Sequence, residues 1–78
     1  MKAKIYISNH CTLCREVIRF FQENGIPYEQ INVTHNQEKF DEMLMLGGIA
    51  TPFIIIESSY FYHFDRKKFE KFLEGKYE

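Results

Sequence analysis

The two cysteines of the chain, Cys11 and Cys14, are separated by two residues and are its only cysteines. A disulfide between them would close a loop of about four residues, and the stability gained from a disulfide grows with the loop that it closes. The spacing therefore indicates chemistry more than stabilisation. In thiol–disulfide exchange, one thiolate attacks a disulfide and a second thiol nearby releases the product, and this pair has the spacing for both steps.

The cysteines lie where a strand pattern changes to a helix pattern. Unpaired N–H groups and the positive end of the helix dipole meet at the start of a helix, and both favour a thiolate over a thiol. We expect Cys11, just outside the helix, to be the exposed nucleophile, and Cys14, one turn in, to be the resolving thiol. The strand pattern consists of Ala3, Ile5 and Ile7, and the helical spacing consists of Leu13, Val17, Phe20 and Phe21.

Metal binding is the competing interpretation of the cysteine pair. Structural zinc sites are tetrahedral, and they commonly combine two such pairs or one pair with two closely spaced histidines. The histidines His10, His35 and His63 do not have that spacing, so no zinc site within one chain is predicted. A metal or iron–sulfur carrier that uses the cysteine thiolates, in a cluster shared between two chains, stays open as the alternative function. Inert cysteines also stay open.

A second helix is predicted between the second and third strands. Thr34 and Gln37 have the form of a capping box, in which the first side chain caps the helix and the second reaches back to it. The glycines at 47–48 predict its end. The inward-facing residues of this helix are predicted to be Phe40, Met43 and Leu44.

A third helix is predicted near the end of the chain, with Asp65 as its N-terminal cap and Gly75 beyond its end. The run of β-branched and aromatic residues at 53–56 is typical of a central strand that is buried on both faces. The other predicted strands cover 28–33 and 60–64. The aromatic residues of the latter leave a third hypothesis open: a redox-responsive module whose aromatic hairpin binds a partner.

The element order is therefore β-α-β-α-β-β-α, in a single domain over residues 1–78. The first two strands are joined through a helix and should be parallel, whereas the last two are joined by a short turn and should be antiparallel. We predict an α/β fold with a four-stranded mixed sheet flanked by three helices.

Composition excludes several classes of protein. With 45% hydrophobic residues, 17% aromatic residues and a net charge of −1, the chain of 78 residues has the composition of a folded domain and not of a disordered segment. The near-neutral charge argues against a nucleic-acid partner. The first residues contain no apolar run long enough for a signal peptide or a membrane helix. We therefore expect no membrane association and a cytoplasmic location.

The sequence resembles the glutaredoxin family, which has the thioredoxin-like fold, over essentially its whole length. The resemblance rests on Tyr6, on the cysteine pair, on the segment 25–28, and on Thr51 and Pro52 before the third strand. The segment 64–69 is similar to that of short glutaredoxin-like proteins and of the redoxins that serve ribonucleotide reductase. The resemblance implies a cis bond before Pro52, and substrate contacts at Thr51 and Pro52 beside the first cysteine.

Several positions depart from the family pattern. Thr12 and Leu13 stand between the cysteines, where the family usually has proline and tyrosine. Ser8 replaces a lysine that contacts glutathione in many members. His63 stands where a glycine is expected, shortly before the aspartate of the glutathione-carboxylate site, which corresponds to Asp65. The resemblance therefore implies substrate binding at Asp65.

His10 directly precedes Cys11, and we include it among the predicted substrate-binding residues. As a cation it could stabilise the thiolate, or it could relay a proton. The simpler alternative is an exposed loop histidine.

The activity implied by the resemblance is that of a thiol–disulfide oxidoreductase, an electron carrier in cell redox homeostasis. Its substrate would be a disulfide in a protein or a small molecule. Its electron donor would be either glutathione or a flavoprotein of the thioredoxin-reductase type. We expect no dissociable cofactor, no metal and a monomeric protein.

Overall fold

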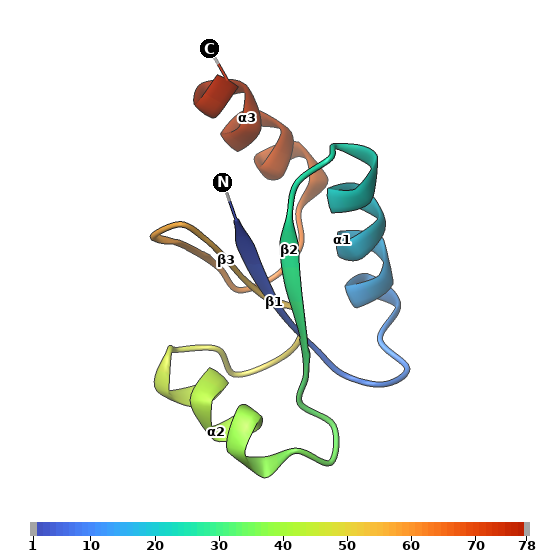
Figure 1. Ribbon diagram of the computed structural model, residues 1–78, viewed down its shortest axis with the longest axis vertical. Coiled ribbons are helices and arrows are strands. Elements are labelled where there is room, and N and C mark those ends of the chain that lie inside the picture. The colour runs from blue at the N-terminus through green and yellow to red at the C-terminus, as the bar shows by residue number, and fades with distance from the viewer. Residues whose placement is uncertain (1, 78) are drawn as a thin grey trace.

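Four strands form one mixed sheet, in the order β2-β1-β3-β4 (Figure 1). β1 runs parallel to β2 and antiparallel to β3, and β3 is antiparallel to β4. The strand directions and the order of elements predicted from the sequence are confirmed. The computed structural model describes residues 2–77, with side chains as far as residue 74. The elements are β1 (Ala3–Ile7), α1 (Thr12–Glu23), β2 (Tyr28–Asn32), α2 (Gln37–Met45), β3 (Phe53–Ile56), β4 (Ser59–Phe61) and α3 (Arg66–Tyr77).

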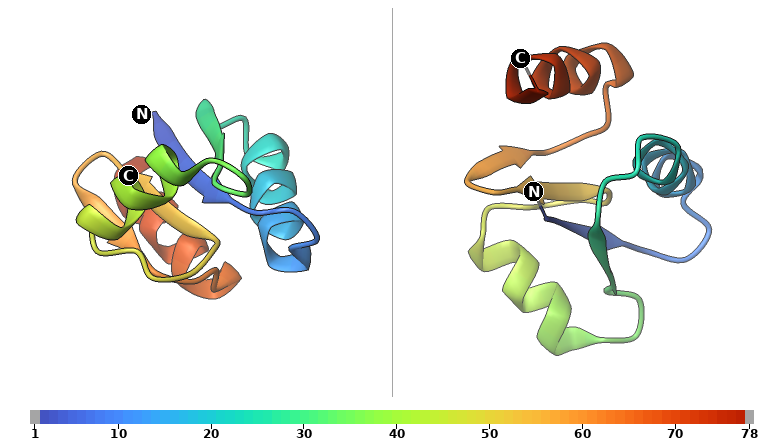
Figure 2. Two further views of the ribbon diagram at one scale, coloured as in Figure 1. Left: turned by 90° about the horizontal axis from the view of Figure 1, so that it is seen from below. Right: turned by 45° about the horizontal axis from the view of Figure 1, so that its top comes forward.

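The helices cover both faces of the sheet: α1 and α3 lie on one face and α2 lies on the other (Figure 2). Each face has its own apolar cluster, and β3 contributes to both because Phe53 faces α2 while Ile54 faces the other two helices. The predicted central strand, buried on both faces, is therefore confirmed. The larger cluster includes Ile5, Phe20, Phe21, Ile54 and Phe69, and the smaller one includes Tyr6, Ile31, Val33, Met43 and Phe53.

The start of α2 differs from the prediction. Asn36, and not Thr34, is the N-cap: its side chain accepts a hydrogen bond of 3.2 Å from the amide of Lys39. The observed N-cap lies two residues after the predicted one, because the chain must first turn from β2 towards the helix. In this turn His35 has a φ of 57°. Thr34 instead accepts a hydrogen bond of 2.8 Å from the amide of Asn9, in the loop that leads to the cysteines.

The inward face of α2 is narrower than predicted. Met43 is fully buried and Phe40 is partly buried, but Leu44 is 43% exposed. Among the helices described within residues 2–77, α2 alone lies on its face of the sheet. A single stripe of its residues therefore meets apolar neighbours, and the prediction for Leu44 is wrong. The helix ends at Met45, and Gly47, with a φ of 101°, takes the left-handed conformation that commonly follows a helix, as the glycines predict.

β4 is shorter than the predicted strand. It ends at Phe61, which pairs with Ile54 of β3. Two residues further along, the pairing would reach Pro52, which has no N–H group to donate to a neighbouring strand. The segment 62–64 therefore leaves the sheet and turns towards α3.

α3 begins where predicted but continues further. Asp65 Oδ1 accepts hydrogen bonds from the amides of Lys67 and Lys68, at 3.1 and 3.3 Å, and so caps the helix. Gly75 lies inside the helix, so the predicted end is wrong; one glycine weakens a helix by about 1 kcal/mol relative to alanine without ending it. Among the helices described within residues 2–77, none is long and apolar enough to cross a membrane.

Tyr6 joins β1 to α2 through a buried phenol. Its side chain is fully buried, and its hydroxyl donates a hydrogen bond of 2.5 Å to Glu42 Oε2. Burial, followed by this hydrogen bond, raises the pKa of Tyr6 above its ordinary value of 10.0. The same hydrogen bond lowers the pKa of Glu42 below its ordinary value of 4.5.

We expect this pair to limit the stability of the fold in both acid and alkali. Because the pKa of Glu42 is lowered, its contribution is present above pH 4.5 and is lost as the pH falls through the folded value. Because the pKa of Tyr6 is raised, its contribution is present below pH 10.0 and is lost progressively as the pH rises beyond it. Tyr6→Phe should therefore lower the thermal midpoint at neutral pH and flatten both limbs of the stability profile.

Thermal unfolding of the parent and of Tyr6→Phe between about pH 3 and 11 measures this effect. Two profiles of the same shape, separated by a constant offset, would contradict it, because the variant would then have lost packing and not the titrating contact.

Candidate active site

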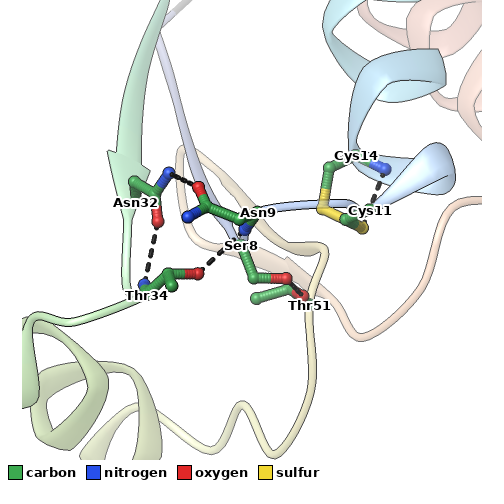
Figure 3. Close-up of a disulfide and its surroundings, with 7 residues drawn as sticks. All are labelled: Ser8, Asn9, Cys11, Cys14, Asn32, Thr34 and Thr51. Atoms are coloured by element: carbon green, nitrogen blue, oxygen red, sulfur yellow. Dashed lines mark hydrogen bonds between the residues drawn. A yellow bond between two sulfur atoms is a disulfide. The ribbon is translucent and has the colours of Figure 1, made fainter.

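Cys11 and Cys14 form a disulfide at the N-terminal end of α1 (Figure 3). Cys11 is partly exposed, whereas Cys14 is 2% exposed and packs in the core beneath α1. The backbone of Cys11 is extended, with φ of −107° and ψ of 103°, so this residue caps the helix without belonging to it. A molecule that arrives from solvent therefore meets the Cys11 sulfur first. Cys11 is more exposed than Cys14, as the sequence predicts.

The start of α1 is an electropositive environment for the Cys11 sulfur. The amide of Cys14 donates a hydrogen bond to Cys11 Sγ at 3.2 Å, and the first turn of the helix contains no acidic residue. A helix of 12 residues presents unpaired N–H groups and the positive end of its dipole at this point. Each of these features stabilises negative charge on the sulfur, and so favours the thiolate of reduced Cys11.

Hydrogen bonds connect the loop between β1 and α1 to the end of β2 (Figure 3). The Asn9 amide donates to Thr34 Oγ1 at 2.8 Å, and the Thr34 amide donates to Asn32 Oδ1 at 2.8 Å. Asn32 Nδ2 then donates to Asn9 Oδ1 at 2.9 Å. The next residue, His10, has a φ of 58°, a left-handed conformation that turns the chain towards α1. Together these features hold Cys11 in a defined place relative to the sheet.

A second contact joins the same loop to the segment before β3. The hydroxyl oxygens of Ser8 and Thr51 lie 2.6 Å apart, within hydrogen-bond distance (Figure 3). The Thr51–Pro52 peptide bond is cis, as the family resemblance implies, and Pro52 is fully buried. Ser8 stands three residues before Cys11 in the sequence, so this contact holds Thr51 next to the start of the cysteine loop.

Gly48 keeps the segment before Thr51 close to the sheet. A Cβ atom at this position would lie 2.6 Å from Phe53 Cγ and 2.9 Å from Met43 Cγ, closer than Cβ atoms approach other side chains. Both neighbours are fully buried, so neither has free space to move into. The glycine therefore allows the chain to pass over Phe53 on its way to Thr51.

The other predicted binding residues lie in two different places. His10 is exposed and lines a pocket beside the disulfide. Asp65 caps α3 and lines a separate pocket of about 150 Å³ at the end of β4, so it does not line the one beside the disulfide. Substrate binding at either residue stays a prediction. Among the described residues, no group of three or more His, Cys, Asp or Glu side chains is placed to hold a metal ion.

The sequence does not predict the residues whose hydrogen bonds hold the cysteine loop in place: Asn9, Asn32 and Thr34. Thr34 stands in a pattern that fits a helix cap equally well. Asn9 lies 23 and 25 positions away from its two partners, so nothing local connects them. The only signal is that a parallel pairing of the first two strands brings two polar loop residues to the same edge of the sheet.

The sequence profile of one protein family, Glutaredoxin, matches residues 3–61, a range that includes both cysteines and the Thr51–Pro52 bond. The chain belongs to the glutaredoxin family. Thiol–disulfide redox chemistry is the general activity of this family, and the Cys11–Cys14 disulfide gives this member the groups that perform it. No curated protein sequence matches this glutaredoxin-family protein.

Solved structures share the fold of this glutaredoxin-family protein. A mutant of the thioredoxin-like protein BC3987 has a TM-score of 0.82 at 22% identity, over 91% of this chain and 97% of that chain. The glutaredoxin-like protein NrdH-redoxin from Escherichia coli has a TM-score of 0.79 at 24% identity, over 91% and 93%. Thioredoxin 1 from Thermosipho africanus has a TM-score of 0.62 at 20% identity, over 100% of each chain. The predicted thioredoxin-like fold is confirmed.

Proposed function

We propose that this glutaredoxin-family protein reduces disulfides in protein or small-molecule substrates, with Cys11 as the nucleophile and Cys14 as the resolving thiol. The observation that carries the proposal is the environment of the Cys11 sulfur. It is partly exposed, it accepts a hydrogen bond from the Cys14 amide at the start of α1, and it is bonded to the sulfur of Cys14, a residue that is only 2% exposed. Cys11, and not Cys14, is therefore the residue that attacks a substrate from solution.

Two exchange steps complete the reaction. The Cys11 thiolate attacks one sulfur of the substrate disulfide, so that a Cys11–substrate disulfide forms and the other substrate sulfur leaves as a thiolate. Cys14 then loses its proton and attacks the Cys11 sulfur, which forms the Cys11–Cys14 disulfide and releases the second substrate thiolate. Two electrons pass from the protein to the substrate, and solvent supplies the protons that the released thiolates take up.

Thr51 and Pro52 are proposed to receive the backbone of the substrate beside Cys11. Thr51 is partly exposed, and its contact with Ser8 holds it at the cysteine loop. An extended segment can bind to exposed main-chain groups of such a strand start as an added short strand.

The electron donor that we propose is a flavoprotein reductase of the thioredoxin-reductase type. Ser8 replaces the lysine that contacts glutathione in many family members, and its hydroxyl is paired with Thr51. The similarly folded NrdH-redoxin is described as a glutaredoxin-like protein with a thioredoxin-like activity profile. The cycle needs no dissociable cofactor, and we place it in the cytoplasm as electron transport for redox homeostasis.

Equilibration in thiol–disulfide buffers tests the proposed function. The protein is incubated without oxygen in thiol–disulfide buffers of graded potential that cover the expected range, its free thiols are trapped, and each sample is weighed by intact mass spectrometry. We expect both thiols to disappear together and reversibly, with a midpoint between about −180 and −270 mV, the range of working oxidoreductases.

Thiols that stay reduced across this window would contradict the proposal, and a retained metal mass would favour the metal or iron–sulfur carrier. A parallel series in glutathione buffers tests the donor. We expect only the Cys11–Cys14 disulfide to accumulate there; a persistent glutathione adduct would favour glutathione over the flavoprotein as the donor.

A further inference from the structure

A polar pocket of about 420 Å³ lies beside the disulfide, between α1 and the edge strand β2. Its volume is within the range of small-ligand sites. Both cysteines reach it, and its apolar lining comes from Ile7 and Ile18. Its polar lining includes Arg15 from the first turn of α1 and Gln30 from β2. A group bound here would therefore sit next to a disulfide held at Cys11.

Thr51 lies outside this pocket, although Ser8, its hydrogen-bond partner, is one of the residues that line it. β1 leads into the loop and has β2 on one side and β3 on the other. Gln30 belongs to β2 and is paired with Ile5, on the face of the sheet that α1 covers. Thr51 and Pro52 precede β3 and do not line the pocket. A substrate backbone bound at Thr51 therefore leaves the pocket free for another part of the substrate.

The pocket is suited to a negatively charged group. Arg15 lines it, and none of its lining residues is acidic, although the chain has 11 acidic residues. Within the described part of the chain, no ion pair or side-chain hydrogen bond occupies the Arg15 guanidinium. A free guanidinium can bind a carboxylate through two parallel hydrogen bonds. The positive end of the α1 dipole acts in the same direction.

We propose that this pocket binds a carboxylate of the substrate that is attached within a few atoms of the reacting disulfide, with Arg15 and the Gln30 side-chain amide as its partners. This inference rests on the proposed function, which brings the disulfide to Cys11. The carboxylate comes either from a free small-molecule disulfide or from an acidic residue beside a cysteine of a polypeptide. The chemistry recognised is the same in both cases.

Three small disulfides that differ in charge test the pocket: 3,3′-dithiodipropionate is negative, 2-hydroxyethyl disulfide is neutral and cystamine is positive. The oxidation of reduced protein by each is followed over a single turnover, which needs no electron donor. Each rate is divided by the rate with dithiothreitol to correct for intrinsic reactivity. At low salt we expect the negative disulfide to be favoured about tenfold over the positive one.

Arg15→Gln is expected to remove most of this preference while the rate with the neutral disulfide stays within about twofold. Arg19→Gln is the matched control: Arg19 is exposed on the same helix and lines a different pocket. Both variants change the net charge equally, so long-range attraction would respond to both. We expect Arg19→Gln to keep the preference. Gln30→Ala, which changes no charge, should slow only the negative disulfide, by about threefold.

Two results would overturn the inference. Equal losses with all three disulfides in Arg15→Gln would mean that Arg15 acts through the Cys11 thiolate and not on the substrate. A preference that Arg15→Gln leaves intact would mean that the pocket is not used. If reduced protein of the natural sequence reacts with none of the three, the proposed function itself fails.

A pair of peptide disulfides, with Glu or Gln beside the cysteine, distinguishes the two sources of the carboxylate. If Arg15→Gln slows the reaction with the Glu peptide but not with the Gln peptide, the pocket binds polypeptide substrates. If Arg15→Gln slows the reaction with dithiodipropionate but with neither peptide, the pocket binds small molecules.

Discussion

Cys11→Ser is expected to lose all detectable disulfide reduction, at least about a 10³-fold loss, because a serine hydroxyl does not ionise to a nucleophile near neutral pH. Cys14→Ser is expected to carry out the first exchange step and then stop. Its Cys11 sulfur remains at the start of α1, with the same partial exposure and with the amide of residue 14 still able to donate to it. What it lacks is the buried thiol that releases the product.

Intact mass spectrometry separates the two variants. Each is reduced, freed of reductant and mixed with excess 2-hydroxyethyl disulfide in the absence of any other thiol. Cys14→Ser should gain one mercaptoethanol adduct within a single turnover and release one equivalent of free thiol. Cys11→Ser should gain none on the same timescale, because Cys14 is 2% exposed.

The two variants control for each other, since each has lost one sulfur and the same disulfide. Circular dichroism shows whether both are folded. Adduct on Cys14 in the Cys11→Ser protein, at the rate seen in the other variant, would falsify the assignment of roles. Full turnover by either variant without added thiol would exclude the dithiol cycle.

The fold and the cysteine pair could be predicted because both depend on local patterns. The alternation that ends at Ile7 and the helical spacing that begins at Leu13 place Cys11 at a helix start without any knowledge of distant contacts. That position already implies the amide hydrogen bond from Cys14 and the difference in exposure. The connections between strands fixed their directions in the same way.

The surroundings of the pair could not be predicted, because they depend on which distant residues meet. Thr34 fits a helix cap by local spacing, but the packed sheet brings it to Asn9 instead. Ser8 and Thr51 are 43 positions apart, and neither residue type indicates that they touch. Leu44 has the spacing of an inward residue, yet α2 packs along too narrow a stripe to bury it.

Phe69→Ala is expected to destabilise the fold by about 3–5 kcal/mol. Phe69 is 1% exposed, and its ring centroid lies 4.4 Å from that of Phe61, 5.4 Å from that of Phe64 and 6.0 Å from those of Phe20 and Phe21. Phe69 therefore connects α3 to both α1 and β4. A domain of this size has a free energy of unfolding of about 4–12 kcal/mol, so the loss is a large part of the total.

Urea unfolding of the reduced proteins measures the change without a contribution from the disulfide. Phe72→Ala is the matched control on the same helix: Phe72 is only partly buried, and we expect a loss of about 1–2 kcal/mol. Equal losses in the two variants would mean that helix propensity, and not the aromatic contacts, decides the result.

Phe69→Ala should also affect the active site, because Phe69 packs on α1, the helix that contains the buried Cys14. In reduced protein of the natural sequence, iodoacetamide should modify Cys11 quickly and Cys14 slowly. In Phe69→Ala, α1 loses its main support from α3, so Cys14 should become modified faster while Cys11, already partly exposed, changes little. Unchanged protection of Cys14 in a protein that has lost 3 kcal/mol or more would show that α1 holds its place on the sheet without α3.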